Sequence, residues 1–412
     1  MALRRTAAAL SLGAMLMQGS ACTATNPGSA WTGTMTDSAG VIIVDNPAQG
    51  MWSDSEAWTL EEELRIGSFG GDLDYLFGQV GAIAVNSTGE IFVVETQAQE
   101  VRVFSPSGEY LRTIGSAGSG PGELGTGATT ILISPGDTLL VPDLRNRRIN
   151  RFAPDGTTLV SAPLDPGSQR PLRYYLSNAG GMAVQLRPLG SAAQAESGRM
   201  DAIRVIDPAG AFGQTLLNVP SGDLIQGNEI HYFTPEPMWA LTDSLTVIYG
   251  VNSEYRVGFY SRDGSLRRIV RRAFERAPIT DRDTRALFGF LDRAWLDAGV
   301  PPARLPANHS RIRFAEFFPA FSYFHIGIDG SLWVQPVQSP GSLSEEDMAR
   351  YNFAEDFGAP GWEVFDAEGR FLGVVEMPHR FQPRMFRGDR IYGVWRDELD
   401  VQYVLRLRVV RE

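Results

Sequence analysis

Lysine is absent from this chain of 412 residues, and all 37 basic side chains are arginine. Its absence excludes Schiff-base chemistry, a lysine general base and a Walker-type phosphate loop, because each of these needs the lysine amine. Histidine is scarce, with four residues, and Cys22 is the single cysteine. One cysteine permits no intramolecular disulfide, so the fold must be held by its hydrophobic core. No motif for a catalytic nucleophile is recognisable either.

The first 21 residues have the features of a secretory signal peptide. Arg4 and Arg5 precede an apolar stretch from Thr6 to Met17, which is too short to span a membrane. The sequence GSAC that ends at Cys22 resembles a bacterial lipobox, although Gly19 stands where that motif usually has leucine. In a lipobox the cysteine is lipidated and becomes the mature N-terminus. We therefore expect an exported, membrane-anchored lipoprotein that faces the periplasm or the cell exterior; the alternative is an ordinary cleaved signal peptide.

The acidic balance of the chain argues against nucleic acid as a partner. Its formal net charge is −11, and loss of the signal peptide would remove two arginines and no acid. An acidic, exported protein is poorly suited to the phosphate backbone. Residues 22–40 are mostly small and polar, which predicts a flexible tether ahead of the folded domain.

A tandem repeat indicates the architecture. The segment from Asn86 to Gly115 resembles the segment from Ser134 to Val160. Phe152 lies 48 residues after the equivalent Phe104, and a turn glycine recurs at the same spacing. A period of this length, made of short strands and glycine turns, is typical of a β-propeller.

The number of turns predicts six four-stranded antiparallel blades over residues 41–412. Turns between the first and second strands are expected at Gly89, Gly136, Gly180, Asp243, Gly330 and Gly388. Turns between the third and fourth strands are expected at 106–108, 154–156, 208–210, 262–264 and 366–369. The sixth of these is missing because the chain ends. We therefore expect an N-terminal strand, Val41 to Asp45, to close the ring as the outer strand of the last blade.

The repeat also resembles a known family. The stretch from Val141 to Gly156, VPDLRNRRINRFAPDG, is similar to an NHL repeat, and the glycine-rich run from Gly115 to Leu124 is typical of the link between such blades. The resemblance is good over residues 81–164 and fades after them. It implies a six-bladed propeller like those of bacterial proteins that are mostly uncharacterised.

One segment interrupts the ring. The turns at Gly264 and Gly369 lie about two blade lengths apart, which predicts an insertion at about residues 272–318. Within it, Thr280 to Gly299 has a helical cap, a helical apolar spacing and a glycine stop. Such a helix would either pack on the side of the ring or form a lid over the channel mouth.

Aromatic side chains concentrate in the loops that lead into the inner strands. Ligands of propellers tend to bind where these loops converge, and aromatic rings with polar groups suit a glycan or peptide. The candidate ligand-binding residues are Tyr75, Phe77, His231, Tyr232, Phe321, His325, His379 and Arg380. We therefore expect a binding module for a peptide, glycan or protein at the channel face, with no cofactor and more likely no catalysis.

Three histidines provide the alternative. His231, His325 and His379 each fall at a predicted inner strand, and three such ligands could hold zinc with one position open for water. Some six-bladed NHL-like lyases that complete peptide amidation are similar, with a metal in the channel. Acids such as Asp72 and Asp74 could instead contact calcium. Neither the three histidines nor these acids have the spacing of a dedicated metal motif. The alternative function is therefore a metal-dependent lyase or hydrolase with its site in the central channel.

Overall fold

The fold is described from a computed structural model, which covers residues 31–53, 55–177, 181–189, 200–221, 225–226, 228–353 and 356–411. The predicted signal peptide, the lipidation candidate Cys22 and the first part of the predicted tether lie outside these residues. The last part of that tether contains β1 (Thr34–Ser38), whose residues are all exposed. Among the described residues, no helix is both long and apolar enough to cross a membrane.

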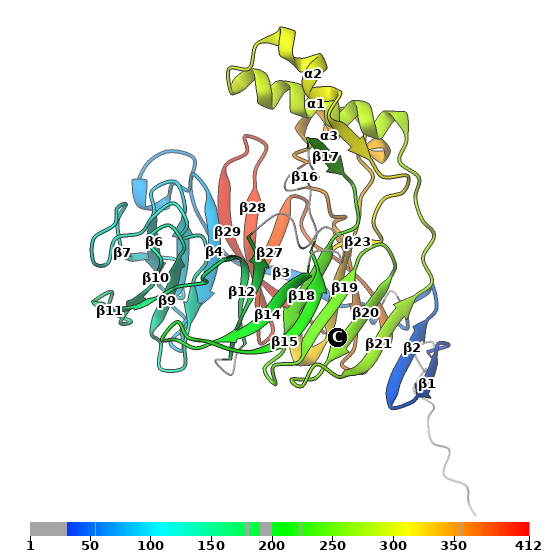
Figure 1. The fold of residues 1–412 in the computed structure, drawn as a ribbon, viewed down its shortest axis with the longest axis horizontal. Coiled ribbons are helices and arrows are strands. Elements are labelled where there is room, and N and C mark those ends of the chain that lie inside the picture. Colours follow the sequence, from blue (N-terminus) through cyan, green and yellow to red (C-terminus); the bar gives the residue numbers. More distant parts are fainter. Residues whose placement is uncertain are drawn as a thin grey trace, which may run out of the picture.

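The described residues form six four-stranded antiparallel blades, as the turns predicted (Figure 1). Their strands, from the axis outward, are β4 (Val80–Val85), β5 (Ile91–Glu95), β6 (Glu100–Phe104) and β7 (Tyr110–Ile114) in blade one; β8 (Leu132–Ile133), β9 (Leu139–Asp143), β10 (Arg148–Phe152) and β11 (Thr158–Pro163) in blade two; β12 (Gln169–Leu176), β13 (Met182–Pro188), β14 (Met200–Ile206) and β15 (Phe212–Pro220) in blade three; β18 (Pro237–Leu241), β19 (Val247–Val251), β20 (Arg256–Tyr260) and β21 (Leu266–Arg272) in blade four; β23 (Phe321–Ile326), β24 (Leu332–Pro336), β25 (Gly361–Phe365) and β26 (Phe371–Glu376) in blade five; and β27 (Phe381–Arg387), β28 (Arg390–Arg396), β29 (Gln402–Val410) and β3 (Thr59–Ile66) in blade six.

The repeat in the sequence corresponds to equivalent positions in blades one and two. Phe104 and Phe152 end their strands with exposures of 0% and 1%. The glycines that follow, Gly108 and Gly156, have φ angles of 86° and 92°, a left-handed conformation that a side chain would disfavour. All the predicted turns join the expected strands except the one at Gly180, which lies outside the described residues.

Six apolar clusters hold the ring together, one between each pair of neighbouring blades. The cluster between blades six and one joins Ile66, Val394 and Val404 to Val80 and Ile91. Because each cluster needs both neighbours, the ring must close for the sixth interface to exist.

An N-terminal strand closes the last blade, as predicted, but the choice of Val41–Asp45 as that strand is wrong. Val41–Asn46 forms β2, which pairs in parallel with β21 at the outer edge of blade four and forms a hairpin with β1. The closing strand is β3 (Thr59–Ile66), which pairs antiparallel with β29. The prediction selected the most apolar N-terminal run, whereas an outer strand lies at the edge of its blade and carries many exposed polar residues.

Charge complementarity supports the observed pairing. The acidic run of β3 lies beside arginines of blade six: Glu63 contacts Arg390 at 2.7 Å and Arg406 at 3.0 Å, and Glu61 contacts Arg408 at 2.5 Å. Opposite charges across a strand pair stabilise a sheet, although exposed pairs contribute little individually.

A recurring polar residue ends the second strand of several blades. The Glu95 carboxylate accepts a hydrogen bond from the Gln79 backbone N–H at 2.5 Å, and Asp143 accepts one from Gly125 at 2.8 Å. Asn252 accepts the equivalent bond in blade four. These buried side chains fix the entry to the inner strand, so their role is structural rather than catalytic.

The predicted insertion is helical and stands on one end of the ring, beyond β16 and β17 in Figure 1, rather than on its outer side. We call this unit the cap. It comprises β16 (Ile225–Gln226), β17 (Glu229–Tyr232), α1 (Asp281–Asp297), α2 (Leu305–His309), β22 (Ile312–Phe314) and α3 (Glu345–Arg350). β17 pairs in parallel with β22. The cap stands beside blades four and five on the face of the ring where the loops into the inner strands emerge, which we call the loop face (Figure 1).

Asp283 joins α1 to the rest of the cap. Its fully buried carboxylate accepts hydrogen bonds from Thr280 in a capping box and from the Ser339 hydroxyl and Gly341 N–H, both at 2.6 Å. Burial alone would raise the pKa of Asp283, but these hydrogen bonds together hold it below its usual value. The charged carboxylate therefore ties α1 to the segment that leads to α3.

Shortening Ile66 to alanine should weaken ring closure. Ile66 is 1% exposed, so we expect the free energy of unfolding to fall by about 2–5 kcal/mol. Leu111→Ala is the matched control, because Leu111 is 44% exposed and should change stability by at most about 0.5 kcal/mol. Urea denaturation followed by tryptophan fluorescence measures both, and equal losses would contradict the role assigned to β3.

Replacing Asp283 with asparagine should loosen α1, because an amide NH2 would face hydrogen-bond donors. Hydrogen exchange of the α1 amides should be at least about tenfold faster in the variant at neutral pH. Because the pKa of Asp283 is lowered in the folded protein, its charged carboxylate stabilises the fold above the usual carboxyl pKa, and this stabilisation is lost as pH falls through the lowered value. The difference in exchange rate between the variant and the wild-type protein should therefore shrink below about pH 4. Asp297→Asn, at the exposed end of the same helix, serves as control; a difference independent of pH would contradict the mechanism.

Candidate functional site

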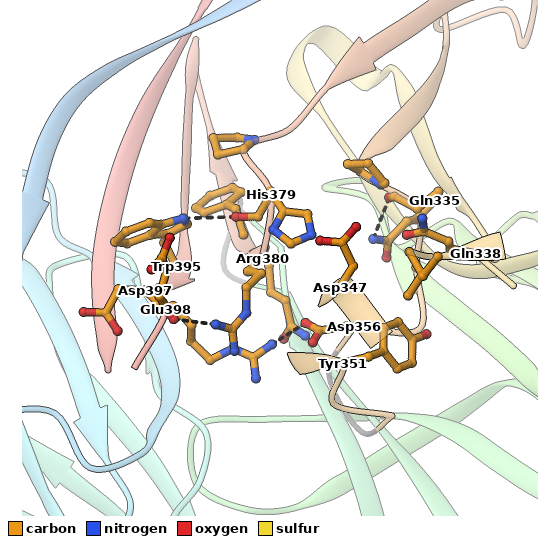
Figure 2. A pocket seen from close by; sticks show the side chains of 18 residues that line it. Gln335, Gln338, Asp347, Tyr351, Asp356, His379, Arg380, Trp395, Asp397 and Glu398 are labelled. Atoms are coloured by element: carbon orange, nitrogen blue, oxygen red, sulfur yellow. Dashed lines mark hydrogen bonds and ion pairs between the residues drawn. The ribbon is translucent and has the colours of Figure 1, made fainter. Parts of the chain in front are cut away.

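A pocket of about 430 Å³ opens on the loop face between blades five and six (Figure 2). Its walls come from the end of β24, the segment 337–360 with α3, the loop before β27, and the turn after β28. The cap therefore contributes one wall and the propeller the others.

Two arginines are bound by the walls of this pocket. Arg396 is 3% exposed and lies 2.5 Å from the Asp356 carboxylate. Arg380 donates hydrogen bonds to the Asp397 backbone carbonyl and to the Asp400 carboxylate. Because these guanidinium groups are engaged within the protein, they hold the walls in place rather than present free positive charge.

Other polar side chains of the pocket are left for a ligand. Within the described part of the chain, the side chains of Gln338, His379 and Glu398 make no hydrogen bond or ion pair. Asp347 bonds to the Ser344 hydroxyl, which caps α3. In Figure 2 the His379 imidazole and the Asp347 carboxylate point toward one another across the pocket.

The charge of this pocket is acidic. Four carboxyl groups line it (Asp347, Asp356, Asp397 and Glu398), against the two arginines that are already paired. Such a lining disfavours anions and suits a neutral or positively charged ligand with several hydrogen-bonding groups.

A second cavity, of about 490 Å³, lies along the axis of the ring, between the inner strands of blades one, two, three, five and six. Arg173 from β12 lies 5.2 Å from the centroid of the Tyr323 ring, whose hydroxyl is 3.1 Å from that of Tyr175. Burial, with Arg384 and Arg173, lowers the pKa of His325 to about 3. His325 is therefore neutral at physiological pH.

The structure does not bring the three candidate metal ligands together. His379 lines the pocket between blades five and six, and His325 lines the axial cavity. His231 lies in β17 of the cap, with its Nε2 atom 3.5 Å from the Glu229 carboxylate. Over the described ranges, no group of three or more His, Cys, Asp or Glu side chains is placed to hold a metal ion.

Four of the aromatic candidates pack inside the protein. Tyr75 and Phe77 contact Phe104 in the interface between blades six and one. Tyr232 belongs to the core of the cap, and Phe321 is 0% exposed between blades four and five. Of the eight candidates, His379 and Arg380 line the pocket on the loop face and His325 lines the axial cavity.

The sequence analysis missed much of each site. Asp347 and Tyr351 reach the pocket through α3, a short helix in a long loop of blade five; the run SLSEED at its start is a capping signal that could have indicated it. Arg173 and Arg384 lie in inner strands, where no local signal marks a residue that lines the axis. Their positions depend on the closure of the ring.

The six four-stranded blades define the class of the protein: the chain is a six-bladed β-propeller. Residues 72–143, in blades one and two, match the model of a family described as 6-bladed beta-propeller. No protein among the curated sequences matches this chain.

Several solved structures are similar in fold. A "Putative exported protein" from Bacteroides fragilis is 12% identical, with a TM-score of 0.48 over 90% of this chain and 100% of that one. Virginiamycin B lyase from Staphylococcus aureus is 12% identical, with a TM-score of 0.42 over 86% of this chain and 100% of that one. A gluconolactonase from Xanthomonas campestris is 12% identical, with a TM-score of 0.39 and the same coverage. Likeness at this level carries no inference about activity.

Proposed function

We propose that this protein is an exported, lipid-anchored propeller that binds a peptide, glycan or protein ligand in the loop-face pocket between blades five and six. The observation that carries the proposal is the set of polar side chains in that pocket, Gln338, His379 and Glu398, which bond to nothing else in the described ranges. Polar groups that are held ready without a partner are typical of a recognition site.

The rigidity of the walls supports binding. The Arg396–Asp356 pair and the bonds of Arg380 hold two sides of the pocket, and Asp283 fixes the segment that leads to α3. A site whose walls are ordered before the ligand arrives loses less conformational entropy on binding.

The lining favours particular parts of such a ligand. Asp347 and Glu398 would accept hydrogen bonds from hydroxyl or cationic groups, and Trp395 offers part of an aromatic ring at the pocket wall. A neutral oligosaccharide and an arginine-containing peptide are the two kinds of ligand that fit this chemistry. The metal-dependent alternative lacks support from the three separated histidines.

The pocket is tested with the double variant Asp347→Asn, Glu398→Gln. Titration calorimetry is carried out with a neutral trisaccharide and with the tripeptide Gly-Arg-Gly, and we expect one of them to bind. Loss of two acceptors should weaken that binding by about tenfold or more.

Glu109→Gln is the control for this experiment, because Glu109 is an exposed acid in an outer turn of blade one. It should leave the affinity unchanged. Wild-type affinity in the double variant, or no binding of either probe, would refute the proposed site.

The lipid anchor is tested separately by Cys22→Ala. If Cys22 carries the lipid, the variant should be recovered in the soluble fraction, whereas the wild-type protein sediments with membranes. Metabolic labelling with a fatty acid analogue should mark only the wild-type protein. Equal sedimentation and equal labelling of both proteins would count against the anchor.

A further inference from the structure

Exposed apolar side chains gather on two loops of blade six. Among the described residues, the four most exposed large apolar side chains are Val160 (87%), Leu73 (74%), Phe69 (72%) and Leu399 (68%). All but Val160 lie in residues 67–79, between β3 and β4, or in residues 397–401, between β28 and β29. We call these two segments the blade-six loops. Single exposed apolar residues are common on protein surfaces, but a group of them on neighbouring loops is typical of an interaction surface.

The blade-six loops lie side by side because β3 pairs with β29. At the start of the first loop, Gly67 packs so closely that an added Cβ atom would come within 2.8 Å of the Tyr403 ring. At the end of the same loop, the Val80 N–H donates a hydrogen bond to the Gln402 side chain at 2.7 Å. Both ends of the first loop are therefore fixed against the residues that directly follow the second.

Hydrogen bonds also hold the shape of each loop. The Ser68 N–H donates to the Tyr75 carbonyl at 3.0 Å, which closes the first loop. In the second, the Asp397 carboxylate accepts hydrogen bonds from the backbone N–H groups of Leu399 and Val401, at 2.9 and 3.0 Å. The exposed apolar side chains thus stand on an ordered backbone. Their contact with water costs free energy, which a partner that covers them would recover.

The charge of the blade-six loops has one sign. Their sequences contain acids but no arginine or histidine. Asp400 is paired with Arg380 and Arg396. In the part of the chain that the structure describes, the other acids of the two loops form no ion pair; these are Asp72, Asp74, Asp397 and Glu398. An apolar surface with this surrounding charge is complementary to a partner that is both apolar and basic.

The same surface continues into the loop-face pocket. Asp397 and Glu398 line the pocket, and Leu399 follows them directly in the chain. Trp395, which also lines the pocket, has its ring 5.4 Å from the Tyr403 ring beside the first loop. In Figure 1 the turn between β28 and β29 points to the end of the ring that carries the cap. A ligand that fills the pocket and extends beyond it toward blade six therefore meets the exposed apolar side chains.

We propose that the loop-face site takes an extended segment of a partner protein, with a basic side chain in the pocket and apolar side chains against Phe69, Leu73 and Leu399. This inference rests on the proposed function and selects a peptide over a glycan. Apolar side chains of a peptide lose no hydrogen bonds when they cover such a surface, whereas the hydroxyls of a sugar would lose theirs to water. Aliphatic and phenyl groups beside charged groups thus fit a basic, apolar peptide.

The experiment uses two heptapeptides, Gly-Arg-Gly-Gly-Leu-Leu-Gly and its reverse, Gly-Leu-Leu-Gly-Gly-Arg-Gly, in titration calorimetry with the whole exported chain. Each is compared with the same peptide in which serine replaces both leucines. We expect at least one leucine peptide to bind about tenfold or more tightly than its serine counterpart, because burial of apolar surface adds to the binding of arginine. Equal affinities of the leucine and serine peptides in both directions overturn the proposal.

A triple variant, Phe69→Ser, Leu73→Ser, Leu399→Ser, locates the contact. It should bind the leucine and serine peptides equally, because it lacks the apolar surface. Val160→Ser is the matched control, since it removes an exposed apolar side chain from β11 of blade two, and it should keep the preference for leucine. These side chains are exposed, so thermal unfolding of both variants should match that of the wild-type protein. A preference for leucine that persists in the triple variant overturns the proposal.

Failure of this inference and failure of the proposed function give different results. Binding of the trisaccharide without any peptide, or equal binding of Gly-Arg-Gly and the leucine peptides, leaves the pocket as a binding site and overturns the peptide surface. Leucine peptides whose binding is weakened by the triple variant but not by Asp347→Asn, Glu398→Gln support the blade-six loops and refute the pocket. If no peptide and no trisaccharide binds, both proposals are overturned.

Discussion

The pairing of β3 with β29 is the interaction on which the whole ring depends. It joins residues 59–66 to residues 404–410, so the two ends of the propeller meet in one blade. Without it blade six would have an open edge and the apolar cluster that contains Ile66 and Val404 would lose one side. Both cavities depend on the same closure, because blade six supplies Arg380 and Arg396 to one and Arg384 to the other. A contact between distant parts of the chain is thus a condition for each proposed site.

The scaffold and the variable loops are stabilised by different means. Buried polar residues at the ends of second strands, such as Glu95 and Asp143, fix the loops of the regular blades through backbone hydrogen bonds. Blade four keeps the equivalent bond at Asn252, but the loops around blades four and five are long and pack against one another in the cap. The cap has its own aromatic core, centred on Phe233, and is joined through Asp283 to the segment that carries α3. The irregular part of the ring is therefore ordered well enough to form one wall of a pocket.

The two cavities differ in the charged residues that line them. On the loop face the arginines are neutralised by Asp356 and Asp400, and acids remain exposed to a ligand. Along the axis the inner strands bring arginines from blades three and six together with tyrosines and aliphatic side chains. The low pKa of His325 follows from burial and from this cluster of positive charge. A chain with a negative net charge thus encloses a cavity lined by several arginines, which its composition does not reveal.

The sequence by itself determined the number of blades, the positions of their turns and the helix of the insertion, because these depend on local features: a glycine with positive φ at Gly108 and Gly156, alternating strand residues, and the cap at Thr280. It also identified His379, Arg380 and His325 as residues of interest, although not that they belong to two cavities. Tertiary structure decided which N-terminal strand closes the ring, since β2 and β3 are both plausible strands and only the fit of Glu61 and Glu63 to the arginines of blade six, with the burial of Ile66, distinguishes them. It likewise decided that Tyr232 and Phe321 are core residues, and that Arg173 and Arg384 line the same cavity. Side chains from blades far apart in the sequence become neighbours only when the ring closes, so no local sequence pattern predicts which of them lie close together.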